Sequence, residues 1–144
     1  MNNKILITGA TSGIGREFTN IYAQRNCDLV LISKHNSAQK LIDFTKDIEI
    51  DVLINNAGVG VYGELIKSDI NAVNSMITLN ISSLVDLTYY FAKEMAKKGR
   101  GKILNVASTA AFQPIPNFAA YAASKAFVLC LETTATSFVK YLNY

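Results

Sequence analysis

The run Thr8-Gly-Ala-Thr-Ser-Gly-Ile-Gly15 directly follows the apolar segment Lys4–Thr8 and leads into a helical pattern. Glycines between a buried strand and a helix permit a tight turn and a close approach of the backbone. They also leave the N–H groups and positive dipole end of the helix open to a phosphate. A Walker A loop is excluded, because Arg16 and Glu17 stand where that motif needs Lys and Ser/Thr. In this position the turn indicates nucleotide binding.

Short apolar runs alternate with helical patterns along the whole chain. Strands are expected at 4–8, 28–33, 51–54 and 102–107, and helices at 14–26, 37–48, 70–98 and from 118 to the C-terminus. Ser37 is a candidate N-cap, Ser68 and Asp69 can cap the long helix, and Gly99 can close it. Nearly all-apolar strands that alternate with helices predict a doubly wound α/β fold, with a parallel sheet covered on both faces.

Composition narrows the class of protein. A length of 144 residues predicts a single domain, residues 1–144, and a hydrophobic fraction of 50% excludes a disordered chain. The net charge of +3 is small and forms no basic run, so nucleic-acid binding is disfavoured. The chain enters a strand at once and has no apolar run near 18 residues, so no membrane segment and a soluble, cytoplasmic protein are expected.

The cysteines and the histidine do not suggest chemistry. Cys27 and Cys130 stand in apolar surroundings without CxxC spacing and are expected to be buried free thiols. His35 is the only histidine and has no Cys or His neighbour at ligand spacing, so no metal site is predicted.

Tyr121 and Lys125 are four residues apart, which places them on one face of the last helix. An ammonium near a phenol favours the phenolate, so this tyrosine could donate a proton to a carbonyl oxygen or accept one from an alcohol. Ser108 ends the fourth strand, where ligands of open α/β sheets bind, and could hold the substrate oxygen. A nucleophilic serine is the competing interpretation, which the absence of GxSxG disfavours.

The order of these features resembles the short-chain dehydrogenase/reductase family. The features are the glycine-rich turn, Asn55-Asn-Ala-Gly58 after the third strand, a lone Asn80, Ser108, and the Tyr121-Ala-Ala-Ser-Lys125 stretch. The resemblance implies hydride transfer between a nicotinamide cofactor and a carbonyl or secondary alcohol. It makes Tyr121 the acid/base, Lys125 its partner and a ribose ligand, and Ser108 the substrate anchor. Asn80 would bend the long helix and order a relay water; from pattern alone, a helix-surface asparagine is an equal interpretation.

The resemblance also implies a set of cofactor ligands. The second strand ends at Ser33-Lys34 without the carboxylate that commonly binds the ribose of NAD, which favours NADP(H), with Lys34 on the 2′-phosphate. A solvated lysine is the alternative. The expected cofactor-binding residues are Gly9, Ser12, Gly13, Ile14, Gly15, Lys34, Asn56, Ala57 and Gly58.

The chain departs from the family in length. By this resemblance it is expected to lack one internal strand–helix unit and the C-terminal substrate segment, which would leave about four strands in the order 2-1-4-5 by the family's numbering. The helix at 37–48 must then lie on the sheet face opposite the first helix. The first helix would be the only cover of its own sheet face, so apolar strand surface is expected to be exposed there. A homodimer through helices 70–98 and 118–141 is expected. A catalytically impaired dimerisation partner or an inactive fragment is the alternative to an enzyme.

Overall fold

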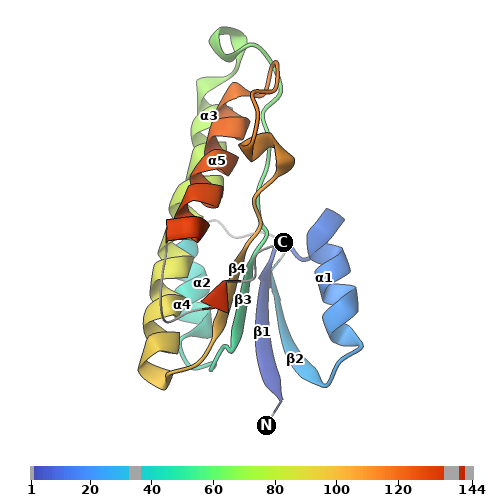
Figure 1. Ribbon diagram of the computed structural model, residues 1–144, viewed down its shortest axis with the longest axis vertical. Helices are drawn as coiled ribbons and strands as arrows, with labels where there is room; N and C mark the ends of the chain where they lie inside the picture. The colour runs from blue at the N-terminus through green and yellow to red at the C-terminus, as the bar shows by residue number, and fades with distance from the viewer. Residues whose placement is uncertain (1, 33–36, 135–139, 142–144) are drawn as a thin grey trace.

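The computed structural model describes residues 2–32, 37–134 and 140–141 (Figure 1). Its strands are β1 (Asn3–Thr8), β2 (Cys27–Ile32), β3 (Val52–Asn55), β4 (Lys102–Asn105) and β5 (Lys140–Tyr141). Its α-helices are α1 (Gly13–Ala23), α2 (Ala38–Thr45), α3 (Ile70–Ile77), α4 (Leu84–Lys98) and α5 (Ala119–Thr134). Short 3-10 turns are η1 (Leu65–Lys67) and η3 (Thr109–Ala111), and a π-helical turn, η2 (Thr78–Ser83), joins α3 to α4.

The strands form one parallel sheet in the order β2-β1-β3-β4-β5. The first four strands, β2-β1-β3-β4, confirm the predicted Rossmann-like order 2-1-4-5, because the family's strands 4 and 5 correspond to β3 and β4 of this chain. The expectation of a last helix reaching the C-terminus was wrong. Helix α5 ends at Thr134, and Lys140–Tyr141 pairs with Lys102 and Ile103 as a short edge strand.

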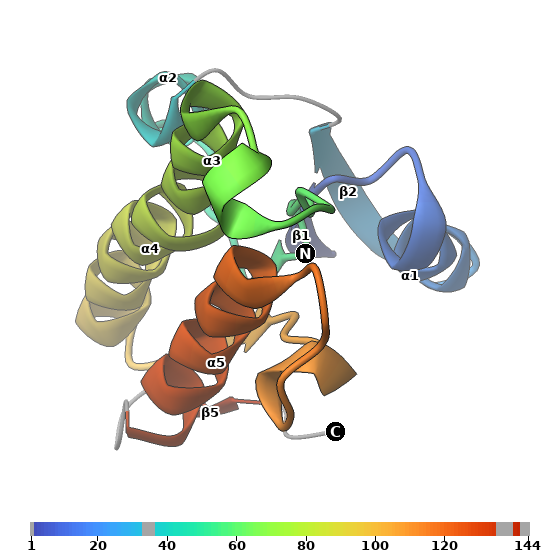
Figure 2. The same ribbon diagram turned by 90° about the horizontal axis from the view of Figure 1, so that it is seen from above.

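Helices cover the two faces of the sheet unequally. Figure 2 shows α1 alone on one side, whereas α2, α3, α4 and α5 lie on the other. Leu41 of α2 packs with Phe91 of α4 in the core cluster under that second face, together with Leu6, Leu53 and Ile103 of the strands. The predicted placement of the helix after β2 opposite α1 is therefore confirmed, and it keeps the crossover right-handed.

The face under α1 is better covered than its single helix suggested. Ile5, Ile7, Ile54 and Leu104 point to this side and are buried. Leu31 of the outer strand β2 remains 44% exposed. Within the described residues, the strongly exposed apolar strand surface expected on this face is thus confined to β2, rather than spread across the sheet.

Caps explain where the helices begin and end. The Ser37 hydroxyl accepts a hydrogen bond from the Lys40 backbone N–H at 3.2 Å, and Asp69 accepts one from the Asn71 N–H at 2.9 Å. Ser68 instead donates to the Glu64 carbonyl. Gly99 takes φ 68° at the end of α4, a conformation that glycine adopts without steric cost.

The two cysteines differ in burial. Cys27 is partly buried, and its thiol donates to the Tyr22 carbonyl oxygen at 2.9 Å. Cys130 is exposed on α5. The prediction of a buried thiol was therefore wrong for Cys130, because the apolar residues around it in the sequence lie on other faces of the helix.

Candidate active site

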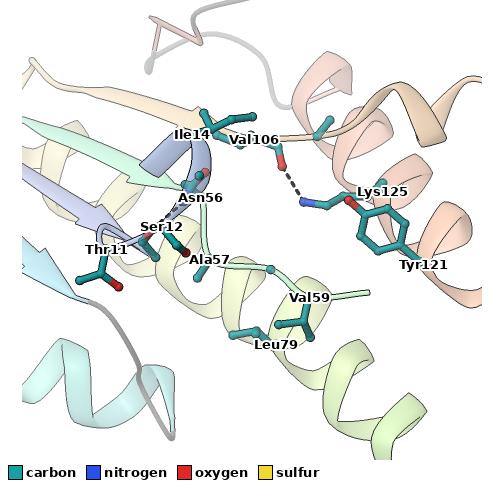
Figure 3. Close-up of a pocket in the computed structure, with 14 residues that line it drawn as sticks. Thr11, Ser12, Ile14, Asn56, Ala57, Val59, Leu79, Val106, Tyr121 and Lys125 are labelled. Carbon is teal, nitrogen blue, oxygen red and sulfur yellow. Dashed lines mark hydrogen bonds between the residues drawn. The ribbon is translucent and has the colours of Figure 1, made fainter. Parts of the chain in front are cut away.

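A cleft of about 810 Å³ opens at the carboxyl ends of the strands, between the start of α1 and helix α5 (Figure 3). Such ends are where ligands of open α/β sheets bind. The residues that line it are Gly9, Thr11, Ser12, Gly13, Ile14, Asn56, Ala57, Gly58, Val59, Leu79, Val106, Ala107, Tyr121 and Lys125.

The glycine-rich turn forms one wall of the cleft. Gly9 and Gly13 have φ values of +65° and +50°, a backbone conformation that residues with a side chain rarely adopt. Gly15 has another role: a Cβ there would lie 2.1 Å from the Gly9 carbonyl oxygen, so this residue lets α1 pack on the turn without lining the cleft. Ser12 precedes α1, and its hydroxyl does not cap the helix. The N-terminus of α1 therefore faces the cleft.

The segment after β3 is bound to that turn. The Asn56 side-chain amide donates to the Thr8 and Gly9 carbonyl oxygens at 3.2 and 3.1 Å. The Thr8 hydroxyl in return accepts from the backbone N–H groups of Asn56 and Ala57, both at 3.1 Å. These bonds join the carboxyl ends of β1 and β3, so the two halves of the cleft floor form a single unit.

Asn55 points away from the cleft into the helical layer. Its amide donates to the Thr88 hydroxyl at 3.1 Å and to the Asn105 side-chain oxygen at 2.9 Å. This buried network links β3, β4 and α4 beneath the site.

Asn80 lies in the π-helical turn and is only 1% exposed, which excludes the helix-surface interpretation. Its Oδ1 accepts from the Val59 N–H at 3.0 Å. Its Nδ2 donates to the Val59 carbonyl at 2.9 Å and to the Ser124 hydroxyl at 3.0 Å. The asparagine thus sits where the predicted long helix is interrupted, and it ties that helix to the loop after β3 and to α5.

Tyr121 and Lys125 project from α5 toward the strand ends (Figure 3). The Lys125 ammonium donates to the Val106 carbonyl oxygen at 2.8 Å, and the side chain is almost fully buried. Burial lowers the pKa of Lys125, because a charged group is less stable away from water. A Cβ on Gly58 would lie 3.3 Å from both the Lys125 ammonium and the Asn80 Oδ1, so these two groups approach the same glycine.

The remaining predicted residues are placed less directly. Ser108 is partly buried and caps η3, where its hydroxyl accepts from the Ala110 N–H at 3.2 Å. It lies outside the residues that line the cleft. Lys34, predicted to bind a 2′-phosphate, lies outside the described residues.

Sequence reasoning missed five residues of the cleft. They are Thr11, Val59, Leu79, Val106 and Ala107. Thr11 lies inside the glycine-rich turn, and Val59, Val106 and Ala107 follow strands, so the strand-end rule could have found them. Leu79 carries no sequence signal, since it looks like any apolar residue of the long helix.

Two classes of site are not seen in the described residues. No group of three or more His, Cys, Asp and Glu side chains among them could hold a metal ion. None of their helices combines the length and apolar character needed to cross a membrane.

A parallel sheet with a glycine-rich turn at its carboxyl end defines a Rossmann-like α/β protein. The sequence model of the family described as short chain dehydrogenase matches residues 43–141. This chain belongs to the short-chain dehydrogenase family.

Three known proteins illustrate the relationship. Human 17-beta-hydroxysteroid dehydrogenase type 3 is 35% identical over 89% of this chain and 51% of its own length. An uncharacterized oxidoreductase of Thermotoga maritima is 30% identical over 97% of this chain and 66% of its own length. The solved structure of a short-chain dehydrogenase from Sphingobium yanoikuyae in complex with NADPH is 30% identical, with a TM-score of 0.80 over 91% of this chain and 63% of that one. The chain thus spans about half to two thirds of these relatives.

Proposed function

We propose that the protein is an NADP(H)-dependent oxidoreductase acting on a carbonyl or secondary alcohol. The observation that carries the proposal is that Tyr121 and Lys125 line the same cleft as the glycine-rich turn. A nucleotide site and a proton-transfer pair thereby share one cavity. Hydride transfer from a nicotinamide to a carbonyl needs both.

The cleft fits a dinucleotide on structural grounds. A Cβ on Gly13 would meet no atom within 4 Å, so the turn leaves room for a ligand against its backbone. The N-terminus of α1 beside it favours a pyrophosphate. In the proposed complex, Gly9, Ser12, Gly13 and Ile14 hold the pyrophosphate, and Gly15 supports the turn. Asn56, Ala57 and Gly58 lie by the ribose.

NADP(H) is proposed over NAD(H) because the sequence has Lys34, and no acid, directly after the second strand, and because the Sphingobium relative was solved with NADPH. In the reaction the cofactor supplies or accepts the hydride. Lys34 would pair with the 2′-phosphate. Lys34→Ala should weaken NADPH binding and leave NADH binding unchanged. Titration of the variant with each cofactor would measure this.

Tyr121 is proposed to donate a proton to the substrate oxygen during reduction and to accept it during oxidation. Lys125 is held by the Val106 carbonyl and places its ammonium in the same cleft as the Tyr121 phenol. Ser108 is proposed to hold the substrate oxygen, although it does not itself line the cleft. Its oxygen accepts from the Ala110 N–H, and among the described residues its hydroxyl proton has no acceptor, so it could donate to a substrate. Asn80 uses both amide protons within the protein, so it would order a relay water through the second lone pair of Oδ1.

A homodimer through α3–α4 and α5 is also proposed, from the helices predicted at 70–98 and 118–141. Tyr89 of α4 and Phe127 of α5 support it, because both are large apolar side chains that stand exposed on these helices. Sedimentation of the chain at several concentrations would test the association.

The function is tested by calorimetric titration of the purified chain with NADPH and with NADH, followed by a carbonyl-substrate screen. Micromolar binding that prefers NADPH is expected. Tyr121→Phe should abolish carbonyl reduction and leave cofactor affinity within about twofold, because the phenol acts on the proton and not on the dinucleotide. A folded chain without affinity for either cofactor would instead support the impaired partner or fragment.

A further inference from the structure

The orientation of the Tyr121 ring depends on packing. Within the described part of the chain its hydroxyl makes no hydrogen bond, and its only hydrogen bonds run through the backbone, where its carbonyl accepts from the Ser124 hydroxyl. A phenol that must meet a substrate oxygen needs a fixed direction, since a misplacement of about 1 Å can cost about a hundredfold in rate. Whatever packs on the ring therefore sets the geometry of proton transfer.

Phe118 is the aromatic residue in contact with that ring. The two ring centroids are 5.6 Å apart with an interplanar angle of 61°, an edge-to-face arrangement. The two residues are three apart, so they are neighbours on one face at the start of α5. The carbonyl of Phe118 accepts the N–H of Ala122 at 2.8 Å, which fixes its backbone to the helix. The ring thus stands on a rigid base.

Gly60 closes the other side of this pair. A Cβ on Gly60 would lie 3.0 Å from Phe118 Cε1 and 3.4 Å from Tyr121 Cδ2. The loop backbone therefore rests against both rings, and any side chain at this position would push on them. Room, and not a special φ value, is what requires glycine here.

Tyr62, from the same loop, adds a third aromatic ring to this edge-to-face cluster. Its ring lies 5.2 Å from that of Phe118 at 62°, and its hydroxyl accepts from the Asn117 side-chain amide at 3.3 Å. The Asn117 carbonyl accepts from the Gly63 N–H at 2.9 Å. The loop that follows β3 is thereby fastened to the turn that precedes α5, with Phe118 between Tyr62 and Tyr121.

We propose that Phe118 is a positioning residue for Tyr121, held in place by Gly60 and Tyr62. The proposal rests on the proposed function, in which Tyr121 moves the proton. Phe118 is not among the residues that line the cleft, so it would act by limiting the directions that the phenol can take. The loop after β3 consequently controls the acid/base group as well as the cofactor.

The test replaces Phe118 and follows Tyr121 directly. In a chain with ¹³C-labelled tyrosine, the Tyr121 ring signals are assigned by their loss in Tyr121→Phe. Phe118→Leu keeps an apolar side chain and removes the ring, so the Tyr121 signals should shift and sharpen as the ring current disappears and the ring turns more freely. Gly60→Ala should shift the same signals by pushing on both rings. Phe112→Leu, at a side chain that is 74% exposed, is the control and should leave them in place.

Kinetics give a second readout. Phe118→Leu should lower kcat about threefold to tenfold, the worth of one aromatic pair, with KM for NADPH unchanged. Phe118→Tyr keeps the ring and should restore kcat. Unchanged Tyr121 signals in the folded Phe118→Leu chain would overturn the positioning role. If the wild type shows no turnover but the Tyr121 signals still shift in Phe118→Leu, the packing role of Phe118 is supported and the enzymatic function is refuted.

Discussion

The Nδ2 of Asn80 donates to the hydroxyl of Ser124 across 3.0 Å, and that hydroxyl donates onward to the Tyr121 carbonyl at 2.7 Å. Asn80 and Ser124 are each 1% exposed. The bond therefore links the interrupted long helix to the turn of α5 that carries Tyr121. Because it is buried, neither partner could turn to water if the other were removed.

Removing either partner should destabilise the protein unequally. Asn80→Ala leaves the Val59 N–H and carbonyl unpaired and removes the donor to the Ser124 hydroxyl, which keeps only its bond to the Tyr121 carbonyl. It should cost about 3 kcal/mol in the free energy of unfolding. Ser124→Ala should cost about 1 kcal/mol. Urea unfolding of both single variants and the double variant measures the coupling, expected at about 1 kcal/mol. Strict additivity would mean that the bond contributes nothing.

Two glycines of the same turn should respond differently to alanine. Gly15→Ala places a Cβ 2.1 Å from the Gly9 carbonyl oxygen and 2.4 Å from the Asn56 amide nitrogen, so the backbone must move. We expect a loss of about 3 kcal/mol. Gly13→Ala meets no atom within 4 Å and bears only the strain of its φ of +50°, about 1 kcal/mol. Thermal unfolding of the matched pair checks this order, and equal losses would contradict the packing role of Gly15.

Buried Lys125 should make stability depend on pH. Burial lowers its folded-state pKa below 10.5, so between the two values the unfolded chain binds more protons than the folded one. The contribution of Lys125 to the free energy of unfolding is largest above pH 10.5 and is lost as pH falls through the folded-state pKa. The unfolding free energy of the cofactor-free wild type should therefore rise relative to Lys125→Met as pH increases toward 10.5. Lys40→Met, which removes an exposed lysine, is the matched control.

Glu132 should show the opposite dependence. Burial raises its pKa above 4.5, although the backbone N–H of Asn105 bonds the carboxylate, and its Oε1 is buried without a partner among the described residues. Its stabilising contribution is full below 4.5 and is lost as pH rises through the folded pKa. Glu132→Gln should thus gain stability over wild type as pH rises above 4.5, and Asp47→Asn, at an exposed carboxyl, is the matched control. Denaturant midpoints across this range provide the measurement, and parallel curves would refute it.

The sequence was most informative where a local pattern sets a local structure. Apolar runs predicted β1 to β4, and the glycines at 9, 13 and 15 marked the turn at the cleft. It was least informative where tertiary packing decides. Nothing local distinguishes Ser108 as a cap of η3 from Ser108 as a cleft residue, or predicts that α5 gives way to a short strand. Asn80 lies between these cases: its polarity marked it within an apolar stripe, but its two partner residues, Val59 and Ser124, come from the loop after β3 and from α5.

The amide of Asn56 bridges the glycine turn and the segment after β3 through hydrogen bonds that use only groups of the chain itself. The conformational entropy of joining these two segments is therefore spent during folding, and not at the moment of association. A dinucleotide would meet a preorganised floor, with little rearrangement of the free protein and a correspondingly fast, nearly rigid docking step. Because the same amide holds the ends of β1 and β3 together, cofactor affinity would depend on the stability of the fold. A substitution that separates these two strands would also disrupt the binding surface.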